Sequence, residues 1–343
     1  MTRSFDTDLI PDAKQADVAR VIHEVFGVDH VEDMRPVTGG LSSARVLRIV
    51  VHGVPYLLRV MMSTDPRNDP ARQFSCMKQA ADIGVAPRMW YANADDRILV
   101  TDFIEAKPFP KASGPMLASV IRQLHSLPDF PRRWNHVDFV DQCIQRFRAA
   151  HILPDDDTGE VLHRYGELTA VYPREADLVA SHNDLKPENM LFDGERFWLV
   201  DWEAANLNDR YFDLAVVANF FVKDEESEQI FLTSYFEEPP RSYMRARFYL
   251  MRQIMHMAYA TVFMTLGTAA GGQLDLQAES PDFDEFHDRL IVRAIDMMSP
   301  AARVQYGRIH FEKLRQTLFS PRFALALDEV GRTSSASSST AGH

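Results

Sequence analysis

The stretch from residue 181 to residue 203, SHNDLKPENMLFDGERFWLVDWE, constrains the fold of this chain more than any other part of it. Two apolar triplets, MLF and FWL, flank Asp193-Gly194, a dipeptide typical of the tight turn between two paired strands. If the triplets pair as a hairpin, its two ends come together, and Asn189 lies close to Asp201. The sequence therefore predicts that an amide and a carboxylate converge at the open end of a hairpin.

Oxygen-bearing groups at that place favour phosphate chemistry. Amide and carboxylate oxygens suit Mg²⁺, which commonly bridges nucleotide phosphates. Asp184, five residues before Asn189, would lie beside such a site and could accept a proton from an attacking hydroxyl. Taken singly, Asp184 could instead cap a turn, Asp201 could simply end a strand, and His182 could only support the loop by hydrogen bonds. Taken together, their order and spacing favour a catalytic loop.

At these residues the chain resembles the protein-kinase-like superfamily, whose catalytic loop reads H-R-D-x-x-x-x-N and precedes a metal-binding aspartate. Only a short polar stretch follows Asp201 before the next helical pattern, which leaves no room for an activation segment. The closer resemblance is therefore to aminoglycoside phosphotransferases and choline/ethanolamine kinases, which phosphorylate small molecules. It implies that Asp184 is the catalytic base and that Lys186 lies beside the transferred phosphate. It also implies that Asn189 and Asp201 bind Mg²⁺.

The resemblance continues outside this stretch and adds scaffold residues. The sequence F-D-L-A at 212–215 looks like a motif of these kinases in which the aspartate, here Asp213, braces the catalytic loop. The sequence L-H-S-L-P at 124–128 looks like the end of a helix in the same kinases. We therefore interpret Asp213, like His182, as structural support.

A glycine-containing loop is the first candidate for nucleotide binding. Residues 38–43, T-G-G-L-S-S, resemble the loop that covers the ATP phosphates in choline-kinase-like proteins, which implies roles for Gly39, Gly40, Ser42 and Ser43. Paired glycines let backbone N–H groups approach an anion closely. Two adjacent glycines also commonly make only a turn, so the position of this loop between a helix and a hairpin is what favours the phosphate role.

Three further residues complete the predicted nucleotide site. Arg59 falls where protein kinases place a phosphate-pairing lysine, and its guanidinium can fork onto two phosphate oxygens, although it could also be a solvated strand residue. The glutamate expected as its partner on the following helix is not apparent, and Gln73 occupies that region. By the same resemblance, Asp102 and Ile104 belong to the hinge whose backbone binds adenine.

The acceptor is predicted less completely. A quaternary ammonium is best held by aromatic faces together with a carboxylate. Glu203 could supply that carboxylate, or could instead be a surface acid or the partner of a nearby arginine. Tyr259, on a helical pattern, is an aromatic candidate where choline kinases have a tryptophan, but Ala204 stands where they often have a tyrosine. The aromatic cage is therefore incomplete.

The order of helical and strand patterns favours an α+β, bilobal, protein-kinase-like fold. We expect a small N-terminal nucleotide-binding lobe at 1–105, with an antiparallel sheet plus a helix. A larger, mainly helical lobe at 106–330 would carry the catalytic and acceptor-binding residues. The small polar residues at 331–343 predict a disordered tail.

Composition narrows the possible partners and the compartment. The formal net charge of -12 argues against sequence-independent nucleic-acid binding, which depends on Lys and Arg. Two isolated cysteines provide neither a disulfide framework nor a metal cluster and indicate a reducing compartment. The apolar stretch 254–270 is too short and too polar for a membrane span, and the N-terminus lacks the apolar core of a signal peptide. We expect a cytoplasmic protein.

These observations together predict an ATP- and Mg²⁺-dependent phosphotransferase that acts on a hydroxyl of a small molecule, foremost a choline- or ethanolamine-like amino alcohol. An aminoglycoside, homoserine or a sugar is the alternative acceptor. A nucleotide-binding pseudokinase scaffold is a second alternative, against which the intact Asp184, Asn189 and Asp201 argue.

Overall fold

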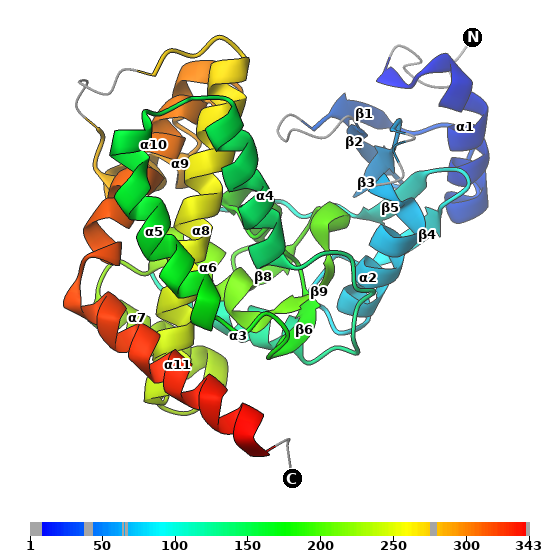
Figure 1. The fold of residues 1–343 in the computed structure, drawn as a ribbon. Helices are drawn as coiled ribbons and strands as arrows, with labels where there is room; N and C mark the ends of the chain where they lie inside the picture. The colour runs from blue at the N-terminus through cyan, green and yellow to red at the C-terminus, as the bar shows by residue number, and fades with distance from the viewer. Residues whose placement is uncertain (1–8, 38–43, 64, 66–67, 275–279, 341–343) are drawn as a thin grey trace. The chain divides into compact units, whose positions relative to one another are not determined.

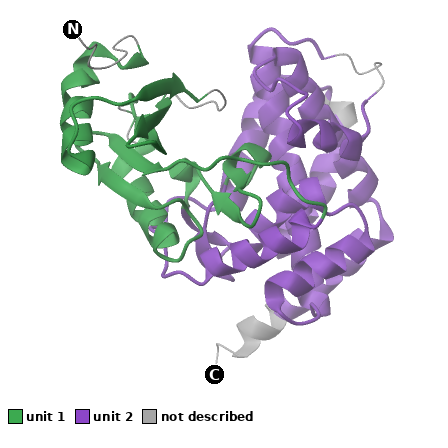
Figure 2. Ribbon diagram, turned by 180° about the vertical axis from the view of Figure 1, so that it is seen from behind, with its two compact units in different colours: residues 1–111, 184–205 green, residues 112–183, 206–343 purple. Residues whose placement is uncertain are grey.

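The computed structural model describes residues 9–37, 44–63, 65, 68–274 and 280–340 of the chain (Figure 1). The fold is α+β, as the sequence predicts, with a five-stranded antiparallel sheet and a helix first and mostly helices afterwards. The chain divides into two compact units, shown in Figure 2: unit 1 holds residues 1–111 and 184–205, and unit 2 holds residues 112–183 and 206–343.

The sheet of unit 1 is built from strands in the order β1-β2-β3-β5-β4, each antiparallel to its neighbours. Its strands are β1 (Asp33–Pro36), β2 (Arg45–Val51), β3 (Val54–Val60), β4 (Met89–Asn93) and β5 (Ile98–Asp102). Strands β2 and β3 form a hairpin around His52 and Gly53, whose φ angles of 51° and 74° are both positive. Positive φ at both loop residues matches the right-handed twist of paired strands, so the turn fixes the register of β2 on β3.

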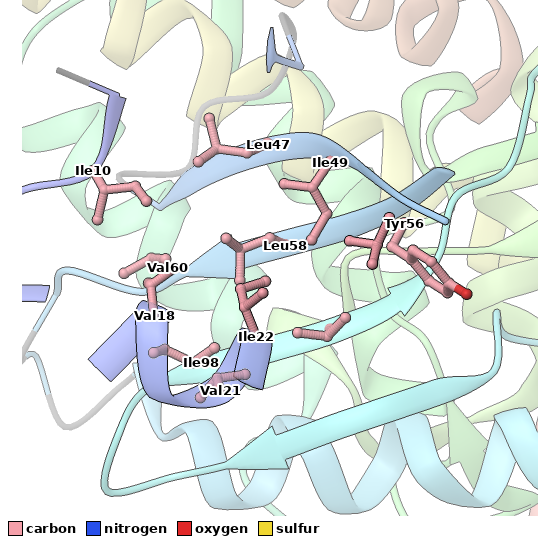
Figure 3. Close-up of a cluster of buried hydrophobic side chains, with 12 residues drawn as sticks. Ile10, Val18, Val21, Ile22, Leu47, Ile49, Tyr56, Leu58, Val60 and Ile98 are labelled. Atoms are coloured by element: carbon pink, nitrogen blue, oxygen red, sulfur yellow. The ribbon is translucent and has the colours of Figure 1, made fainter. Parts of the chain in front are cut away.

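Helix α1 (Asp12–Phe26) covers the apolar side of this sheet. Its buried residues recur at helical spacing, and β2 alternates buried with partly exposed side chains, so each of these elements offers one apolar face. Figure 3 shows the resulting core, which includes Val18, Val21, Ile22, Leu47, Ile49, Leu58 and Ile98. Helix α2 (Pro70–Asp82) begins after Asp69, whose carboxylate accepts a hydrogen bond from the backbone N–H of Ala71.

The stretch singled out in the sequence, from Asp184 onward, belongs to unit 1. It contains the turns η3 (Pro187–Asn189) and η4 (Trp202–Ala204) and the strands β7 (Met190–Phe192) and β8 (Phe197–Leu199). The two strands pair antiparallel, and residues 193–196, which begin with Asp193 and Gly194, connect them. Backbone hydrogen bonds from Leu199 to Val85 (2.9 Å) and from Lys107 to Phe192 (2.7 Å) attach this hairpin to the rest of unit 1.

Unit 2 is mostly helical. It has a two-stranded sheet of β6 (Leu178–Ser181) and β9 (Asn206–Asp209). Its helices are α3 (Ser113–His125), α4 (His136–Ala149), α5 (Asp155–Val171), α6 (Arg210–Phe221), α7 (Glu225–Phe236), α8 (Ser242–Ala269), α9 (Phe283–Ile291), α10 (Pro300–Leu318) and α11 (Pro321–Thr340). None of the helices in the described ranges combines the length and apolar character needed to cross a membrane. Helix α11 continues into 331–343, the segment whose composition predicts disorder.

Helix α8 forms the core of unit 2 and packs against α10, α11, α6 and α4. A close approach of α8 and α10 depends on glycine: a Cβ atom on Gly307 would lie 2.6 Å from Cγ and 2.7 Å from the backbone N of Met264. Such distances are shorter than any van der Waals contact, so a larger residue there would push the two helices apart.

Candidate active site

The β7–β8 hairpin brings the predicted amide and the strand leading to the predicted carboxylate side by side. Beyond the last paired residues, the backbone N–H of Val200 donates to the carbonyl oxygen of Asn189 at 3.0 Å. Asp201 follows directly and has the left-handed backbone conformation (φ 66°, ψ 71°), which is uncommon for a residue other than glycine. The chain therefore turns sharply at Asp201, a type of local strain that is concentrated at functional sites.

Asp184 is the centre of a small polar group. The side-chain nitrogen of Asn189 donates to a carboxylate oxygen and to the backbone oxygen of Asp184, both at 2.8 Å. Lys186 Nζ lies 2.7 Å from the same carboxylate oxygen. Burial alone would lower the pKa of Lys186, but the carboxylates of Asp184 and Asp201 outweigh burial and raise it. The lysine is therefore held as a cation next to Asp184.

Arg59 of β3 joins the predicted nucleotide site to the residues after β8. Its guanidinium lies 2.9 Å from Oδ1 of Asp201 and also contacts the carboxylate of Glu203. The partner that the sequence left open for Glu203 is thus an arginine 144 positions away. Gln73, in the region where the kinase glutamate was expected, is buried on α2, and the carboxylates on Arg59 come from the 201–203 turn.

Arg72 of α2 also contacts this group, although the sequence did not predict that it would. Its guanidinium donates to the backbone oxygen of Glu203 at 2.7 Å and to that of Ala205. It is buried, and it fixes the main chain of the turn that carries the two acidic side chains. A charged residue on the apolar face of an amphipathic helix indicates a buried polar contact. The group that Arg72 binds, however, lies 131 positions away in the sequence.

Unit 2 holds the two residues that precede Asp184. The carboxylate of Asp213 accepts hydrogen bonds from the backbone N–H groups of His182 and Asn183, both at 2.8 Å, and lies 3.2 Å from Nε2 of His125. Burial would raise the pKa of Asp213, but the hydrogen bond from His125 and the nearby imidazole rings lower it, so it is anionic. These contacts are those expected of a brace for the loop.

Asn183 takes the place of the arginine found in the protein-kinase loop, and it is also fixed within unit 2. Its side-chain nitrogen donates to the backbone oxygens of Ser181 (3.1 Å) and Asn206 (3.3 Å), and its side-chain oxygen accepts from Asn208 at 2.6 Å. Its φ of 65° is left-handed, a conformation that asparagine tolerates better than most residues. A short amide therefore suits this position better than an arginine.

Two further predicted residues of unit 1 lie at the end of β5 and just after it. Asp102 ends β5, where its backbone N–H donates to Arg88 (3.0 Å) and its carbonyl oxygen accepts from the hydroxyl of Thr101 (3.0 Å). Ile104, two residues further on, is half-buried. The predicted phosphate loop, with Gly39, Gly40, Ser42 and Ser43, lies outside the described residues.

Tyr259 belongs to unit 2 and is half-buried on α8. Its ring packs against Phe263, Tyr306 and His310, with ring centroids 4.8 to 5.8 Å apart. The predicted aromatic residue therefore sits in a larger cluster of rings from α8, α9 and α10, which includes Phe283.

The chemistry of the donor atoms fits a divalent cation with a preference for oxygen. Because the nitrogen of the Asn189 amide is turned to Asp184, its oxygen is the atom that it can offer to a cation. Carboxylate and amide oxygens are the ligands that Mg²⁺ takes, usually completed by water and substrate phosphates. Among the described residues, no group of three or more His, Cys, Asp or Glu side chains is arranged to hold a metal on its own.

Comparison with known proteins gives a family and a set of related folds. Residues 33–249 match the phosphotransferase enzyme family (APH). Protein LicA from Haemophilus influenzae is 36% identical over 78 residues, which are 21% of this chain and 29% of that protein. The chain thus spans less than a third of the length of this relative in the aligned region.

Two crystal structures share the fold at low sequence identity. A choline/ethanolamine kinase family protein from Mesorhizobium loti is 20% identical, with a TM-score of 0.68 over 93% of this chain and 99% of that one. Spectinomycin phosphotransferase APH(9)-Ia, solved with ADP and spectinomycin, is 13% identical, with a TM-score of 0.56 over 88% of this chain and 98% of that one.

Proposed function

Since the chain belongs to the phosphotransferase enzyme family and is therefore a small-molecule kinase, we propose that it transfers the terminal phosphoryl group of ATP to an alcohol. The observation that carries this proposal is the group formed by Asp184, Lys186 and Asn189, with Asp201 one residue beyond the hydrogen bond that closes the hairpin. A base, a cation and oxygen donors within one unit are the parts that phosphoryl transfer needs.

In the proposed mechanism Asp184 accepts a hydrogen bond from the acceptor hydroxyl and takes its proton. The hydroxyl oxygen bonds to phosphorus while the bond between phosphorus and the leaving ADP oxygen breaks. Lys186 offsets the negative charge on the transferred group, and Arg59 pairs with phosphate oxygens. Asn189 and Asp201 would hold Mg²⁺, which when bound neutralises phosphate charge. Catalysis is then mostly positioning and charge neutralisation.

We propose further that ATP binds through the N-terminal region. Asp102 has its N–H engaged with Arg88, so the backbone group it offers to adenine is its carbonyl oxygen, which has a second lone pair. A carbonyl acceptor selects the amino group of adenine over the carbonyl of guanine. Ile104 and the residues 39, 40, 42 and 43 would complete the site.

The acceptor that we propose is a choline- or ethanolamine-like amino alcohol. Support comes from the shared fold of the Mesorhizobium loti protein and from two chemical features, the acidic side chain of Glu203 and the aromatic cluster around Tyr259. Carboxylates and aromatic ring faces each attract cations. Spectinomycin phosphotransferase has a related fold, and this favours an aminoglycoside-like acceptor as the second candidate.

Release of ADP with a panel of acceptors tests this function. We expect turnover with choline or ethanolamine. Turnover only with aminoglycosides, homoserine or sugars would show that the proposed amino-alcohol acceptor is wrong and would identify the acceptor class instead. Asp184→Asn should lower turnover on the order of 10²–10⁴-fold while ATP binding persists, because the base is lost and the shape is kept. Asp82→Asn, an exposed acid on α2, is the matched control. ATP binding without turnover of any acceptor would instead indicate a pseudokinase.

A further inference from the structure

Arg59 is the most buried member of the ion-pair group in unit 1. Its side chain is 11% exposed, whereas those of Asp201 and Glu203 are 26% and 31% exposed. A buried guanidinium must be paired with an anion, because leaving its charge alone in a region poor in water is very unfavourable. The carboxylates, by contrast, can exchange this partner for water or a ligand. The guanidinium thus always needs an anionic partner, but one anion can replace another in that role.

The backbones on both sides of this ion pair are held independently of it. Arg59 is paired within the sheet to Val46 of β2 and to Leu99 of β5. On the other side, Arg72 holds the carbonyl oxygen of Glu203. Breaking the contacts of the Arg59 guanidinium with the two carboxylates therefore requires only side-chain rotation, not a change in the fold of unit 1.

The same atoms have competing uses in the proposed reaction. Asp201 can bind either Arg59 or a divalent cation strongly, but not both at once. A divalent cation on Asp201 would be repelled by the Arg59 guanidinium, which lies 2.9 Å from the same carboxylate. Glu203, likewise, cannot neutralise an acceptor's cation while it neutralises Arg59. Phosphate oxygens are a better partner for Arg59 because they accept two parallel hydrogen bonds from one guanidinium.

From this geometry we infer that Arg59 is the resident counter-ion of Asp201 and Glu203, and that a nucleotide phosphate must draw it away before these carboxylates bind a divalent cation and the acceptor. This inference rests on the proposed function, since it assigns an order of binding to the same site. It makes Arg59 a positioning residue for the metal and acceptor groups as well as a phosphate ligand. Nucleotide and divalent cation then strengthen each other's binding through the release of this ion pair.

Binding of Mn²⁺ without nucleotide tests the inference directly. Free Mn²⁺ measured by electron paramagnetic resonance should show weak binding to the wild-type protein. Arg59→Met keeps an unbranched, flexible side chain and removes its charge, so we expect Mn²⁺ to bind about tenfold more tightly or better. The gain should disappear in Arg59→Met/Asp201→Asn, which locates the cation. Lys78→Met, which removes an exposed positive charge from α2 of the same unit, is the control.

An unchanged Mn²⁺ affinity in Arg59→Met, or a gain equal to that of Lys78→Met, would overturn the inference. The measurement needs neither acceptor nor turnover, so it can succeed even if the chain fails every activity assay, and can fail in an active kinase. Circular dichroism verifies that each variant is folded.

A second test does not depend on the folding of Arg59→Met. Glu203→Gln removes one anchor of Arg59, so metal-free ATP should bind several-fold more tightly to this variant, measured by calorimetry in the presence of a chelator. The same Glu203→Gln change is then made in an Arg59→Lys background, where the lysine retains the charge but cannot hold two carboxylates in a fork. We expect the gain in ATP affinity to be much smaller there than in the wild-type background. A gain of the same size in both backgrounds would mean that Glu203 acts only by its charge, and the inference would be wrong.

Discussion

Four acidic residues that lie close together in the sequence have very different surroundings. Asp201 and Glu203 in unit 1 are partly exposed, and they share a single arginine side chain. Asp209 and Asp213 in unit 2 are buried, with side chains 7% and 0% exposed. The first pair has partners that can rotate away, whereas the second is held by several fixed groups. We propose that acidic side chains exchange with ligands in unit 1, whereas in unit 2 they fix the structure.

The network around Asp209 illustrates the fixed type. Its carboxylate accepts hydrogen bonds from Arg247 at 2.6 Å, from the hydroxyl of Tyr172 at 2.8 Å and from the backbone N–H of Tyr211 at 2.9 Å. Burial raises the pKa of Asp209 although Arg247 opposes this shift. The Arg247 side chain is fully buried, and it also lies over the rings of Tyr172 and Tyr211. Such a network joins β9, α6 and α8 through side chains that are buried.

The comparison of these two pairs of carboxylates predicts that Asp213→Asn and Asp201→Asn differ most in the free energy of unfolding. Replacing Asp213 removes the anion that pairs with His125 and binds two backbone N–H groups, and we expect a loss of about 3 kcal/mol in the free energy of unfolding. Replacing Asp201 breaks a partly exposed pair and should cost about 1 kcal/mol or less. Urea unfolding at neutral pH measures both values. Similar losses in the two variants would show that burial does not separate these carboxylates.

The pH dependence of the stability of Asp213→Asn has a predictable direction. Because the pKa of Asp213 is lower in the folded protein than in the unfolded chain, its stabilising contribution is present above the unfolded pKa. It is lost as the pH falls through the folded pKa. The deficit of Asp213→Asn relative to wild type should therefore shrink in acid.

The sequence was sufficient to predict the fold and the local geometry of the hairpin. The Asp193-Gly194 dipeptide located the hairpin of β7 and β8, because a turn depends on neighbouring residues. The sequence did not identify the partner of Glu203 or the role of Arg72. Both depend on contacts between residues more than 130 positions apart, which only the packing of the sheet, α2 and the 201–205 turn determines.

The resemblance to kinases supplied residue types but not their mutual contacts. It predicted that Asp213 supports the loop, and the hydrogen bonds to His182 and Asn183 fit that role. It gave no indication that Arg59 would lie on Asp201 and Glu203, because the expected partner was a glutamate on the following helix. Arg247 was likewise missed, since a basic residue within a long apolar pattern does not reveal which acid it meets.

His136 is a buried titratable residue that, unlike Asp209 and Asp213, has no hydrogen-bond partner for its side chain among the described residues. Neither ring nitrogen of His136 has a hydrogen-bond partner in the described part of the chain, and the ring packs at 3.9 Å between centroids on Phe212. Burial lowers the pKa of His136 to about 3. Below an unfolded pKa of about 6.5, the unfolded chain takes up a proton that the folded protein excludes, so stability falls with decreasing pH by about 1.4 kcal/mol per unit.

Replacing this ring tests that contribution. His136→Phe retains an aromatic ring and removes the titration, so between pH 7.5 and pH 5 we expect it to lose about 2 kcal/mol less stability than wild type. His23→Gln, at an exposed position, should leave the wild-type pH dependence almost unchanged. Free energies of unfolding at the two pH values measure the difference. An unchanged pH dependence in His136→Phe would mean that the buried ring is protonated in the folded protein or is hydrated.

The smallest effect is expected for an ion pair that is exposed on both sides. Lys78 and Asp82 are one turn apart on α2, 2.9 Å from each other, with side chains 66% and 62% exposed. A double-mutant cycle with Lys78→Gln and Asp82→Asn should give a coupling energy of about 0.5 kcal/mol or less. Water and salt screen such a pair, so the coupling should decrease further in 1 M salt, where the Debye length is about 3 Å. The corresponding cycle for Arg59 and Asp201 should give a larger coupling with a weaker dependence on salt, because Arg59 is buried. If the two cycles agreed in size and in salt dependence, the ion pair at the candidate active site would be an ordinary surface contact, and a ligand would gain nothing special by replacing it.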